Sequence, residues 1–454
     1  MSIRYERLLI AVVGLTLLNG ASAQRSPTTA PPDSGGLLLS NVRVFDPASG
    51  TFTPPIDILV RDGRIASTGT MLPAGRAITR IDGAGRYALP GLWDSHVHFS
   101  FLTLGGDSIV VETLEAFARN GITSVRDVGG PLATIAALRT RVDEGNILGP
   151  SIYFAGPMLT GAPVWEFLRQ INGALAGFVV VVASPAELDT LLDRLAAHGA
   201  SMTKAVDRWD ATLLRYYLRA AKARSLRVVW DAGLPILNPV PIDTALALGV
   251  TSIEHAKAAW SGVLRDDLAR EVQAFMTSGK DYGSGEELML RIMTLGERSV
   301  SHDRLAALAD TWARSGSFFS PTLLVAVSNL AENPPERYRR PFEGLLAVSK
   351  LFARELSARG VRLLVGQDQV QPDGTWKEME ALAAAGVSNV EILRGATIYP
   401  AQFLGLDDSV GTLTRGRRAD IVILEANPLE RIENIRSVWK VVRHGKVIPD
   451  KSGQ

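Results

Sequence analysis

The sequence predicts an α/β protein, a (β/α)8 TIM barrel with a small β-sandwich domain formed by both chain ends. The middle of the chain alternates apolar strand segments with Ala/Leu/Arg-rich stretches of helical spacing, the pattern of a parallel βα architecture. Both ends instead contain short strands separated by turn residues. The chain has 454 residues, enough for a barrel-sized domain and an accessory unit.

The N-terminus has the pattern of an export signal. Arg4 and Arg7 precede an apolar core at residues 8–18, and Ala21-Ser22-Ala23 supplies a small-residue cleavage pattern. We therefore expect an exported protein, periplasmic or secreted, with no stable membrane span once the signal is removed. A retained membrane anchor is the alternative, but the core is shorter than the roughly 20 apolar residues that span a bilayer.

Short strands and hairpin turns occupy both ends of the mature chain. Strands and turns run from residue 37 to 88, and the stretches 419–424, 438–442 and 444–448 have the same style. We expect the two ends to build one sandwich. The predicted units are a signal peptide at 1–23, a Pro/Ser/Thr-rich linker at 24–36, the N-terminal half of the sandwich at 37–89, the barrel at 90–405 and the C-terminal half of the sandwich at 406–454.

Eight apolar segments are the candidate barrel strands, with helical stretches such as 185–198 and 212–224 between them. In such a barrel, catalytic residues collect at the C-terminal ends of the strands. An open doubly wound sheet is the alternative, but no glycine-rich dinucleotide-binding turn follows any of these strands. The candidates are residues 91–97, 122–126, 151–155, 202–206, 227–231, 252–255, 317–322 and 361–366.

Composition narrows the function classes. The hydrophobic content of 46% and the charged content of 21% describe a folded globular protein. A formal net charge of +1 gives no electrostatic reason to expect nucleic acid or an anionic membrane as partner. The chain contains no cysteine, so disulfides, thiolate zinc sites and cysteine nucleophiles are excluded. Any metal must be bound by His, Asp, Glu or a modified Lys.

The most informative motif is Asp94-Ser95-His96-Val97-His98, at the end of the first candidate barrel strand. Side chains two residues apart on a strand point to the same face, so both imidazoles leave the strand in one direction. Histidine is the commonest neutral metal ligand and suits zinc and similar ions. The pair is therefore a candidate metal site, although an isolated H-x-H pair is also frequent by chance.

Four further polar residues lie on or just after other candidate strands: Lys204, Asp231, His255 and Asp368. In a closed barrel these positions converge on one mouth together with the histidine pair, which favours a metal site. Each has a structural alternative: Lys204 as a salt-bridged core lysine, His255 as a hydrogen-bonded core histidine, and Asp368 as a helix cap. The remaining histidines, His198, His302 and His444, occupy a helix end, a helix start and a terminal hairpin, and we expect structural roles for them.

Four segments carry a family resemblance that none of them carries alone. Together they make the chain resemble the metal-dependent amidohydrolase superfamily, in its imidazolonepropionase-like and prolidase-like branch. The resemblance extends from about residue 37 to residue 448. The segments are PGLWDSHVH at 90–98, GITSVRD at 121–127, GVTSIEH at 249–255, and GTL with GRRAD between 411 and 420.

The resemblance implies a ligand set and a mechanism. His96, His98 and Asp368 would bind the more buried metal ion and His255 the more exposed one. Lys204 would be carboxylated and would bridge the two ions, which are expected to be zinc. Asp368 would also accept the proton of the metal-activated water and deliver it to the leaving amine.

One position departs from the family pattern. Where the family has a histidine at the end of the fifth strand, this chain has Asp231, which strand alternation turns inward while Trp230 turns outward. A carboxylate oxygen binds zinc at about 2.0–2.2 Å, but the aspartate side chain is shorter than that of histidine. The sequence therefore leaves the count at two zinc ions or one, since three protein ligands and a water suffice for hydrolysis.

The predicted function is exported, zinc-dependent hydrolysis of an amide or peptide bond in a small molecule, of the dipeptide or N-acyl amino acid type. One alternative is a lactone, carbamate or ester hydrolase with the same site. The other is a catalytically silent binding protein with a degraded second metal site. The sequence leaves the oligomeric state open, a homo-oligomer included.

Two secondary expectations concern the mouth of the barrel. A basic residue would hold a substrate carboxylate, and Arg126, Arg169 and Arg208 are the candidates near strand ends. The glycine-containing stretch 275–299 is expected to be a flexible excursion, either a lid or an ordinary surface insertion.

Overall fold

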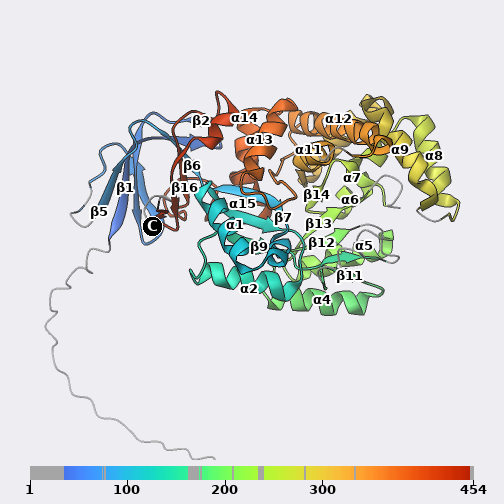
Figure 1. The fold of residues 1–454 in the computed structure, drawn as a ribbon, viewed down its shortest axis with the longest axis horizontal. Helices are drawn as coiled ribbons and strands as arrows, with labels where there is room; N and C mark the ends of the chain where they lie inside the picture. Colours follow the sequence, from blue (N-terminus) through green and yellow to red (C-terminus); the bar gives the residue numbers. More distant parts are fainter. Residues whose placement is uncertain are drawn as a thin grey trace, which may run out of the picture. The chain divides into compact units, whose positions relative to one another are not determined.

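Parallel β-strands form the middle of the chain in the computed structural model, as the alternation of segments predicts (Figure 1). The first sheet contains β7 (Leu92–Val97), β8 (Ile122–Asp127) and β9 (Ser151–Phe154). The second, ordered β11-β10-β12-β13-β14-β15, contains β10 (Met158–Thr160), β11 (Val179–Val181), β12 (Met202–Val206), β13 (Arg227–Asp231), β14 (Ser252–Glu254) and β15 (Phe318–Ser320). The structure describes residues 35–449 except 74, 76–77, 162–172, 174–175, 207–208, 234–239, 281–282 and 332–333.

Backbone hydrogen bonds continue from one parallel sheet to the other at both edges. On one side the Ser201 amide donates to the Phe154 carbonyl over 3.1 Å. On the other side residues 361–366 lie between β15 and β7: the Leu364 amide donates to Phe319 (2.7 Å) and the Ser95 amide donates to Val365 (2.7 Å). Seven of the predicted barrel strands are thus present as strands, and the eighth segment occupies the place expected for it.

The eighth segment is not the regular strand that the sequence predicts, because only Leu363 forms a strand bridge, to Phe319. The end of helix α14 (Asn389–Gly395) supplies hydrogen-bond acceptors where a regular strand ladder is missing. The Val365 amide donates to the Gly395 carbonyl over 3.1 Å, and the Trp93 amide of β7 donates to the Ala396 carbonyl over 2.9 Å. Packing of this helix against the strand edge is a tertiary feature that the apolar run alone does not reveal.

The third candidate strand is interrupted, which the sequence prediction missed. Gly156 adopts a positive φ of 74° and precedes Pro157, so the chain breaks after β9 and resumes as β10. Strand β10 pairs with β12, aligning Met158 with Lys204, and on its other edge it pairs with the short β11. The break therefore adds two strands beside the site that were not predicted.

Strands from both chain ends share one mixed sheet, which confirms that the two ends build a common β unit. Strand β1 bends at Asn41, whose φ is 57°; its first half pairs with β3 and β5, and its second half with β6 and β2. The other strands are β2 (Thr51–Phe52), β3 (Ile56–Arg61), β4 (Arg64–Gly69), β5 (Ile78–Asp82), β6 (Tyr87–Pro90), β16 (Ile421–Leu424), β17 (Val438–Arg443) and β18 (Lys446–Val447), with β1 at Gly36–Asp46.

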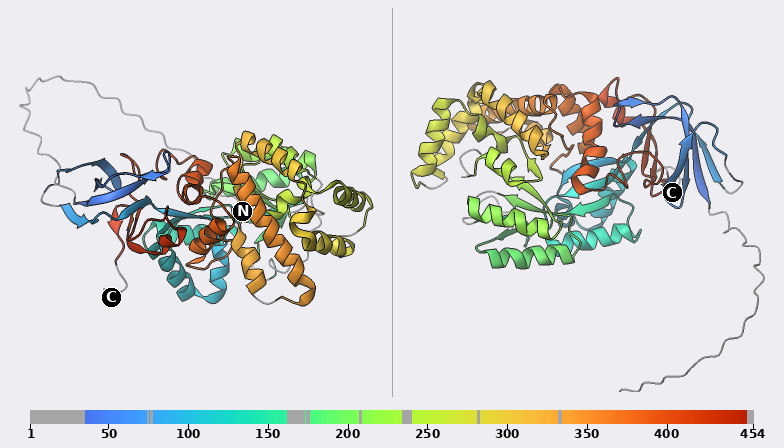
Figure 2. Two further views of the ribbon diagram at one scale, coloured as in Figure 1. Left: turned by 90° about the horizontal axis from the view of Figure 1, so that it is seen from above. Right: turned by 180° about the vertical axis from the view of Figure 1, so that it is seen from behind.

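Helices surround the parallel strands in all views (Figure 2). Two of the predicted helices begin at capping side chains: Ser184 accepts from the Glu187 amide at the start of α4, and Asp210 accepts from two amides at the start of α5. The helices are α1 (Asp107–Arg119), α2 (Leu132–Asp143), α4 (Pro185–Ala197), α5 (Ala211–Ala223), α6 (Ile242–Leu248), α7 (Lys257–Trp260), α8 (Asp266–Thr277), α9 (Glu286–Leu295), α10 (His302–Ser315), α11 (Leu323–Ala331), α12 (Glu336–Ala358), α13 (Gly374–Ala384), α14 (Asn389–Gly395) and α15 (Ile398–Leu404).

The stretch 275–299 is largely helical in its described part, and its role as a lid or an ordinary surface insertion stays a prediction. It contains the end of α8, all of α9 and the 3-10 turns Gly283–Gly285 and Gly296–Ser299. Helix α9 packs tightly on α12, because a Cβ at Gly344 would lie 1.8 Å from the Met293 carbonyl oxygen. Among the described residues, no helix is long and apolar enough to cross a membrane.

Candidate metal centre

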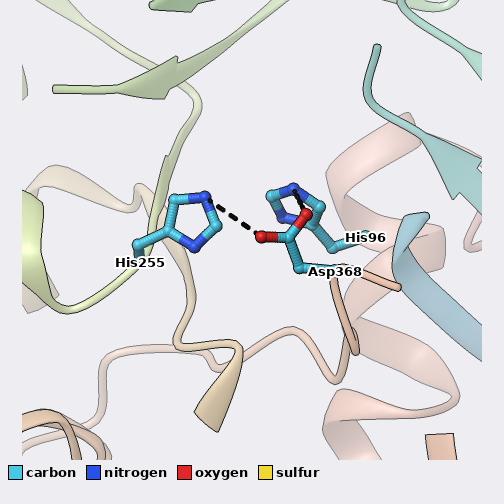
Figure 3. A group of neighbouring side chains, drawn as sticks. All are labelled: His96, His255 and Asp368. Carbon is cyan, nitrogen blue, oxygen red and sulfur yellow. Dashed lines mark ion pairs between the residues drawn. The ribbon is translucent and has the colours of Figure 1, made fainter. Parts of the chain in front are cut away.

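Three histidine side chains turn one ring nitrogen toward Asp368. His96 and His98 come from the end of β7 and His255 from the residue after β14, as predicted from the strand ends. The distances from Nε2 of His96 and of His98 to Asp368 Oδ1 are both 3.2 Å, and from His255 Nε2 to Asp368 Oδ2 the distance is 3.7 Å. One ligand atom each from His96, His255 and Asp368 lies within 4.8 Å of the others (Figure 3).

Hydrogen bonds at the opposite ring nitrogens define the orientation of the first two histidines. His98 Nδ1 lies 2.9 Å from the Gly129 carbonyl oxygen, which can only accept, so Nδ1 carries the proton. Burial lowers the pKa of His98, so the ring is neutral near pH 7 and Nε2 presents a lone pair. His96 Nδ1 lies 2.7 Å from Glu254 Oε2. Burial alone would lower the pKa of His96, but Asp368 and Glu254 raise it.

The third histidine is fixed by a hydroxyl group. The Thr322 hydroxyl donates to the Pro321 carbonyl over 2.8 Å, so its oxygen accepts from His255 Nδ1, 2.6 Å away. Burial lowers the pKa of His255, which leaves a neutral ring with an unprotonated Nε2. That lone pair faces Asp231 Oδ2 at 3.3 Å as well as the more distant oxygen of Asp368.

These orientations fit a cation. An unprotonated imidazole nitrogen and a carboxylate oxygen repel each other, and both His98 and His255 face Asp368 in this way. A metal ion between them turns the repulsion into coordination, and imidazole with carboxylate is a ligand set of zinc. The outward Nδ1–H groups each have an acceptor, which is the arrangement that orients metal-ligating histidines.

Asp368 is the centre of the cluster. Burial favours its neutral form, but His96 and His255 hold the pKa of its carboxyl group well below the usual range. Its backbone has a φ of 53° and that of His255 a φ of 65°, a region that non-glycine residues rarely adopt. The Asp368 amide donates to the His96 carbonyl over 2.8 Å, which helps to hold this conformation. Strained backbone is frequent at functional sites.

Lys204 reaches the same cluster from β12. Its side chain is buried, and Nζ lies 3.3 Å from His96 Nε2. Within the described part of the chain, no carboxylate lies within ion-pair distance of this ammonium group. The structural alternative for Lys204, a salt-bridged core lysine, therefore lacks a partner carboxylate among those residues.

Asp231 lies where the family pattern has a histidine, and the structure turns it toward the site. Its Oδ2 faces His255, while Oδ1 lies 3.7 Å from Lys257 Nζ and accepts from the Gly233 amide over 3.1 Å. Burial would raise its pKa, but Lys257 and His255 hold it well below the usual range. The preceding Trp230 is fully buried in the core on the other face, as strand alternation predicts.

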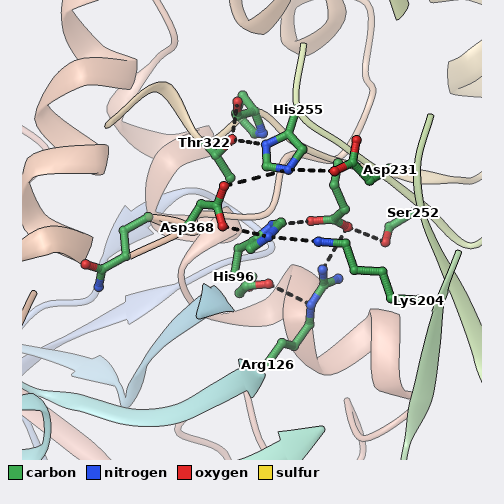
Figure 4. A network of polar contacts seen from close by, with 12 residues as sticks. His96, Arg126, Lys204, Asp231, Ser252, His255, Thr322 and Asp368 are labelled. Atoms are coloured by element: carbon green, nitrogen blue, oxygen red, sulfur yellow. Dashed lines mark hydrogen bonds and ion pairs between the residues drawn. The ribbon is translucent and has the colours of Figure 1, made fainter. Parts of the chain in front are cut away.

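A buried ion pair behind His96 escaped the sequence analysis as a functional feature (Figure 4). Arg126 Nη2 donates to Glu254 Oε1 over 2.9 Å, and Glu254 in turn holds His96. Burial raises the pKa of Glu254, but Arg126 and His96 lower it below its ordinary value. The position of Glu254 directly before the ligand His255 was the available signal.

The prediction that Arg126 holds a substrate carboxylate is wrong. Its side chain is completely buried, and Nε donates to the Ser95 carbonyl over 2.8 Å. A strand-end position suggested an accessible guanidinium, but Nη2 is paired with Glu254, and Nη1 is buried without a hydrogen-bond partner among the described residues. The other two candidates, Arg169 and Arg208, lie outside the described residues.

A second carboxylate connects the two segments that carry the ligands. Asp94 accepts from the His96 amide (3.1 Å), from Gln367 Nε2 (2.7 Å) and from the Thr375 hydroxyl (2.7 Å). It thereby ties β7 to the segment that ends in Asp368. The remaining histidines occupy the places predicted for them: His198 ends α4, His302 begins α10, and His444 lies between β17 and β18.

Comparison with known proteins finds a family model and relatives that match most of the chain. The model of the amidohydrolase family matches residues 87–448. An imidazolonepropionase of Mycolicibacterium smegmatis is 25% identical over 433 residues, which are 93% of this chain and 98% of that protein. An ochratoxinase of Aspergillus niger is 23% identical over 392 residues, covering 78% of this chain and 74% of that protein.

Solved structures are similar over almost the whole chain. A Xaa-Pro dipeptidase with bound methionine has a TM-score of 0.69 at 20% identity, covering 91% of this chain and 100% of that chain. A prolidase from Bifidobacterium longum, whose assignment is provisional, has a TM-score of 0.68 at 23% identity, covering 92% and 96%. At these identities the likeness concerns the fold.

The fold and the cluster of histidine and aspartate side chains define a metal-dependent hydrolase with an α/β fold. Because the family model matches well over half of the sequence, the chain belongs to the amidohydrolase family. It is a hydrolase that acts on C–N bonds, and His96, His255 and Asp368 form a candidate metal site of the kind typical of the family.

Proposed function

We propose that this protein is an exported, zinc-dependent hydrolase that cleaves the amide bond of a dipeptide or an N-acyl amino acid. The observation that carries the proposal is the convergence of one ring nitrogen each from His96, His98 and His255 on the oxygens of Asp368. Two of the similar solved structures are a Xaa-Pro dipeptidase and a provisionally assigned prolidase, which supports a small amide substrate. We also propose that the eight parallel segments form a closed (β/α)8 barrel, because backbone hydrogen bonds join the two sheets at both edges.

We propose two groups of ligands. His96, His98 and Asp368 Oδ1 would hold the first ion, and His255 with Asp231 would hold the second, which leaves Asp368 Oδ2 free to accept a proton. Asp231 thus takes the role of the missing histidine, which supports two zinc ions over one.

Lys204 completes the proposed ligand set in a carboxylated form. A buried ammonium group without a carboxylate at ion-pair distance is costly, and Lys204 has none at that distance among the described residues. Carboxylation replaces the positive charge by an anionic oxygen donor, which a metal ion can bind. Lys204 Nζ lies 3.3 Å from His96 Nε2, which supports a place for this donor in the same cluster.

The reaction then follows from the protein groups. When bound, the zinc ions lower the pKa of a water molecule and polarise the substrate carbonyl. Asp368, kept ionised by its low pKa, accepts the proton of the attacking water as the new C–O bond forms. The same carboxyl group then donates that proton to the amine as the C–N bond breaks.

Elemental analysis of the mature protein, purified without chelator, tests the metal content. We expect about two zinc equivalents per chain. One equivalent would limit the site to His96, His98 and Asp368, and none, even after resupply of zinc, would contradict the proposal. Rates of hydrolysis of matched amide and ester substrates test which bond is cleaved. The alternative of an ester or lactone hydrolase requires a preference for the ester that is stronger than the higher intrinsic reactivity of esters explains.

A further inference from the structure

A small pocket opens directly beside the candidate metal centre. It has a volume of about 130 Å³, and His255 and Asp368 form part of its wall. The opposite wall comes from helices α11 and α12 and is largely apolar, through Val325, Ala326 and Leu345. For comparison, an apolar cavity of roughly 150 Å³ accommodates benzene. The pocket therefore has room for one aliphatic side chain or one small ring.

Lys257 is the cationic side chain among the residues that line this pocket. It lies two positions after His255, at the start of α7, with 29% of its side chain exposed. Its nearest charged neighbour is Asp231, whose Oδ1 is 3.7 Å from Nζ. That distance is too long for a hydrogen bond, and no described residue accepts one from this ammonium group.

The environment of Lys257 differs from that of the other two cations beside the site. Arg126 is completely buried and paired with Glu254, so it cannot reach a substrate. Lys204 is also buried and lies against His96. Lys257 alone among these three combines solvent access, free hydrogen-bond donors and a position on the wall of the pocket that Asp368 lines.

We propose that Lys257 binds the carboxylate of the substrate's amino-acid part while the apolar pocket receives its side chain. This inference rests on the proposed amide hydrolysis and narrows its substrate to N-acyl amino acids or dipeptides with a free C-terminal carboxylate and a small or medium apolar C-terminal side chain. A carboxylate paired with an ammonium group gains a charge-assisted hydrogen bond, which explains why a cation stands on an otherwise apolar wall.

The proposed pose is consistent with the chemistry of the site. The amide nitrogen of such a substrate is attached to the carbon that carries both the carboxylate and the side chain. Anchoring these two groups in the pocket holds the scissile carbonyl near His255 and Asp368. Water adds to that carbonyl carbon, the C–N bond breaks, and the free amino acid leaves from the pocket with the proton delivered to its nitrogen.

The test compares two substrates of the zinc-loaded enzyme, N-acetyl-L-leucine and its neutral analogue N-acetyl-L-leucinamide. We expect the wild type to prefer the carboxylate in kcat/KM, and Lys257→Met to reduce this preference about 10- to 100-fold, mainly through KM. That range corresponds to the loss of a hydrogen bond to a charged group. The matched control is Lys222→Met, because Lys222 is an exposed lysine on α5, and this variant should leave the preference unchanged.

The shape of the pocket is tested separately. Ala326→Leu narrows the wall on α11 without changing a charge, and should shift the preference from N-acetyl-L-leucine toward N-acetylglycine by about tenfold or more. Zinc content is measured for every variant, so that a loss of metal is not mistaken for a loss of substrate binding.

Calorimetric binding of the same two compounds separates the possible failures. Binding of N-acetyl-L-leucine that depends on Lys257, without hydrolysis, would keep this inference and overturn the proposed function. Hydrolysis of both compounds with a preference that Lys257→Met does not alter would overturn this inference and keep the proposed function. If the wild type neither binds nor hydrolyses either compound, both are overturned.

Discussion

Arg126 Nη2 lies 2.9 Å from Glu254 Oε1 in a part of the site where both side chains are completely buried. The other oxygen of Glu254 holds Nδ1 of His96, so the ion pair fixes the direction of a candidate metal ligand. Arg126 is itself anchored by its bond to the Ser95 carbonyl. A buried charge pair contributes little to stability by itself, and its value here lies in the orientation of His96.

Substitution of Glu254 by Gln is therefore expected to weaken zinc binding about 10- to 100-fold, the usual effect of removing a partner of a ligating histidine. The amide keeps the size of the side chain but no longer offers a negative charge to His96 or Arg126. Zinc affinity is measured by competition with a chelator, and a thermal melt of the zinc-loaded variant confirms that it is folded. Unchanged affinity in a folded variant would contradict the role of Glu254.

Thr322 is expected to control the second ligand group. Thr322→Val preserves the shape of the side chain but removes the oxygen that accepts from His255 Nδ1, so His255 is free to carry its proton on Nε2. We expect loss of one of two bound zinc ions at limiting zinc, with the first ion retained. Thr322→Ser keeps the hydroxyl and serves as the control. Equal zinc content in the two variants would show that the hydroxyl does not fix the ring.

At Asp231 a substitution can restore the histidine of the family pattern instead of removing a group. Restoration of the family residue by Asp231→His should keep a second ligand beside His255, whereas Asp231→Ala should lose the second zinc ion. If both variants and the wild type bind one zinc ion, Asp231 is not a ligand in this chain. Calorimetric titration of the zinc-free protein with zinc distinguishes two binding events from one.

The positions of the candidate metal-site residues on the strands were predictable because they follow strand periodicity. His96 and His98 share a face, and Asp231 turns inward while Trp230 turns outward, which needs no more than alternation along a strand. The strand boundaries at 202–206 and 227–231 are also those of the structure. These features are local, so the sequence is sufficient to reveal them.

The features that sequence analysis missed depend on contacts between distant segments. Arg126 appeared accessible because its burial depends on Glu254, 128 residues further on. Residues 361–366 appeared to be a regular strand because the insertion of α14 at their edge leaves no trace in their own composition. The pocket cation Lys257 was overlooked since it follows the strand end by two residues, at the start of a short helix.

The most direct effect of pH on stability is expected at Glu378, which connects α13 to the first turn of α11. Its two carboxyl oxygens accept from the amides of Leu323 and Leu324 over 2.9 and 2.7 Å. Burial nevertheless raises its pKa to about 8, from an ordinary value of 4.5. The folded protein thus binds this proton more tightly than the unfolded chain does.

The sign of the effect follows from proton linkage. Below about pH 4.5 Glu378 is protonated in the folded and the unfolded state, so its ionisation does not change the free energy of unfolding. As the pH rises from there to about 8, the carboxyl group ionises in the unfolded chain only, and this lowers the stability of the folded state. Asp127, whose pKa burial raises to about 7, acts in the same direction.

We therefore compare wild type with Glu378→Gln, so that the contribution of Asp127 cancels. The free energy of unfolding of both zinc-loaded proteins is measured with denaturant at pH 5 and at pH 8.5. From the lower to the higher pH, the variant should become more stable relative to wild type. Any constant cost of replacing the carboxyl group by an amide cancels in this shift. A difference that is the same at both pH values would mean that Glu378 is ionised throughout this range, held by its two backbone amides.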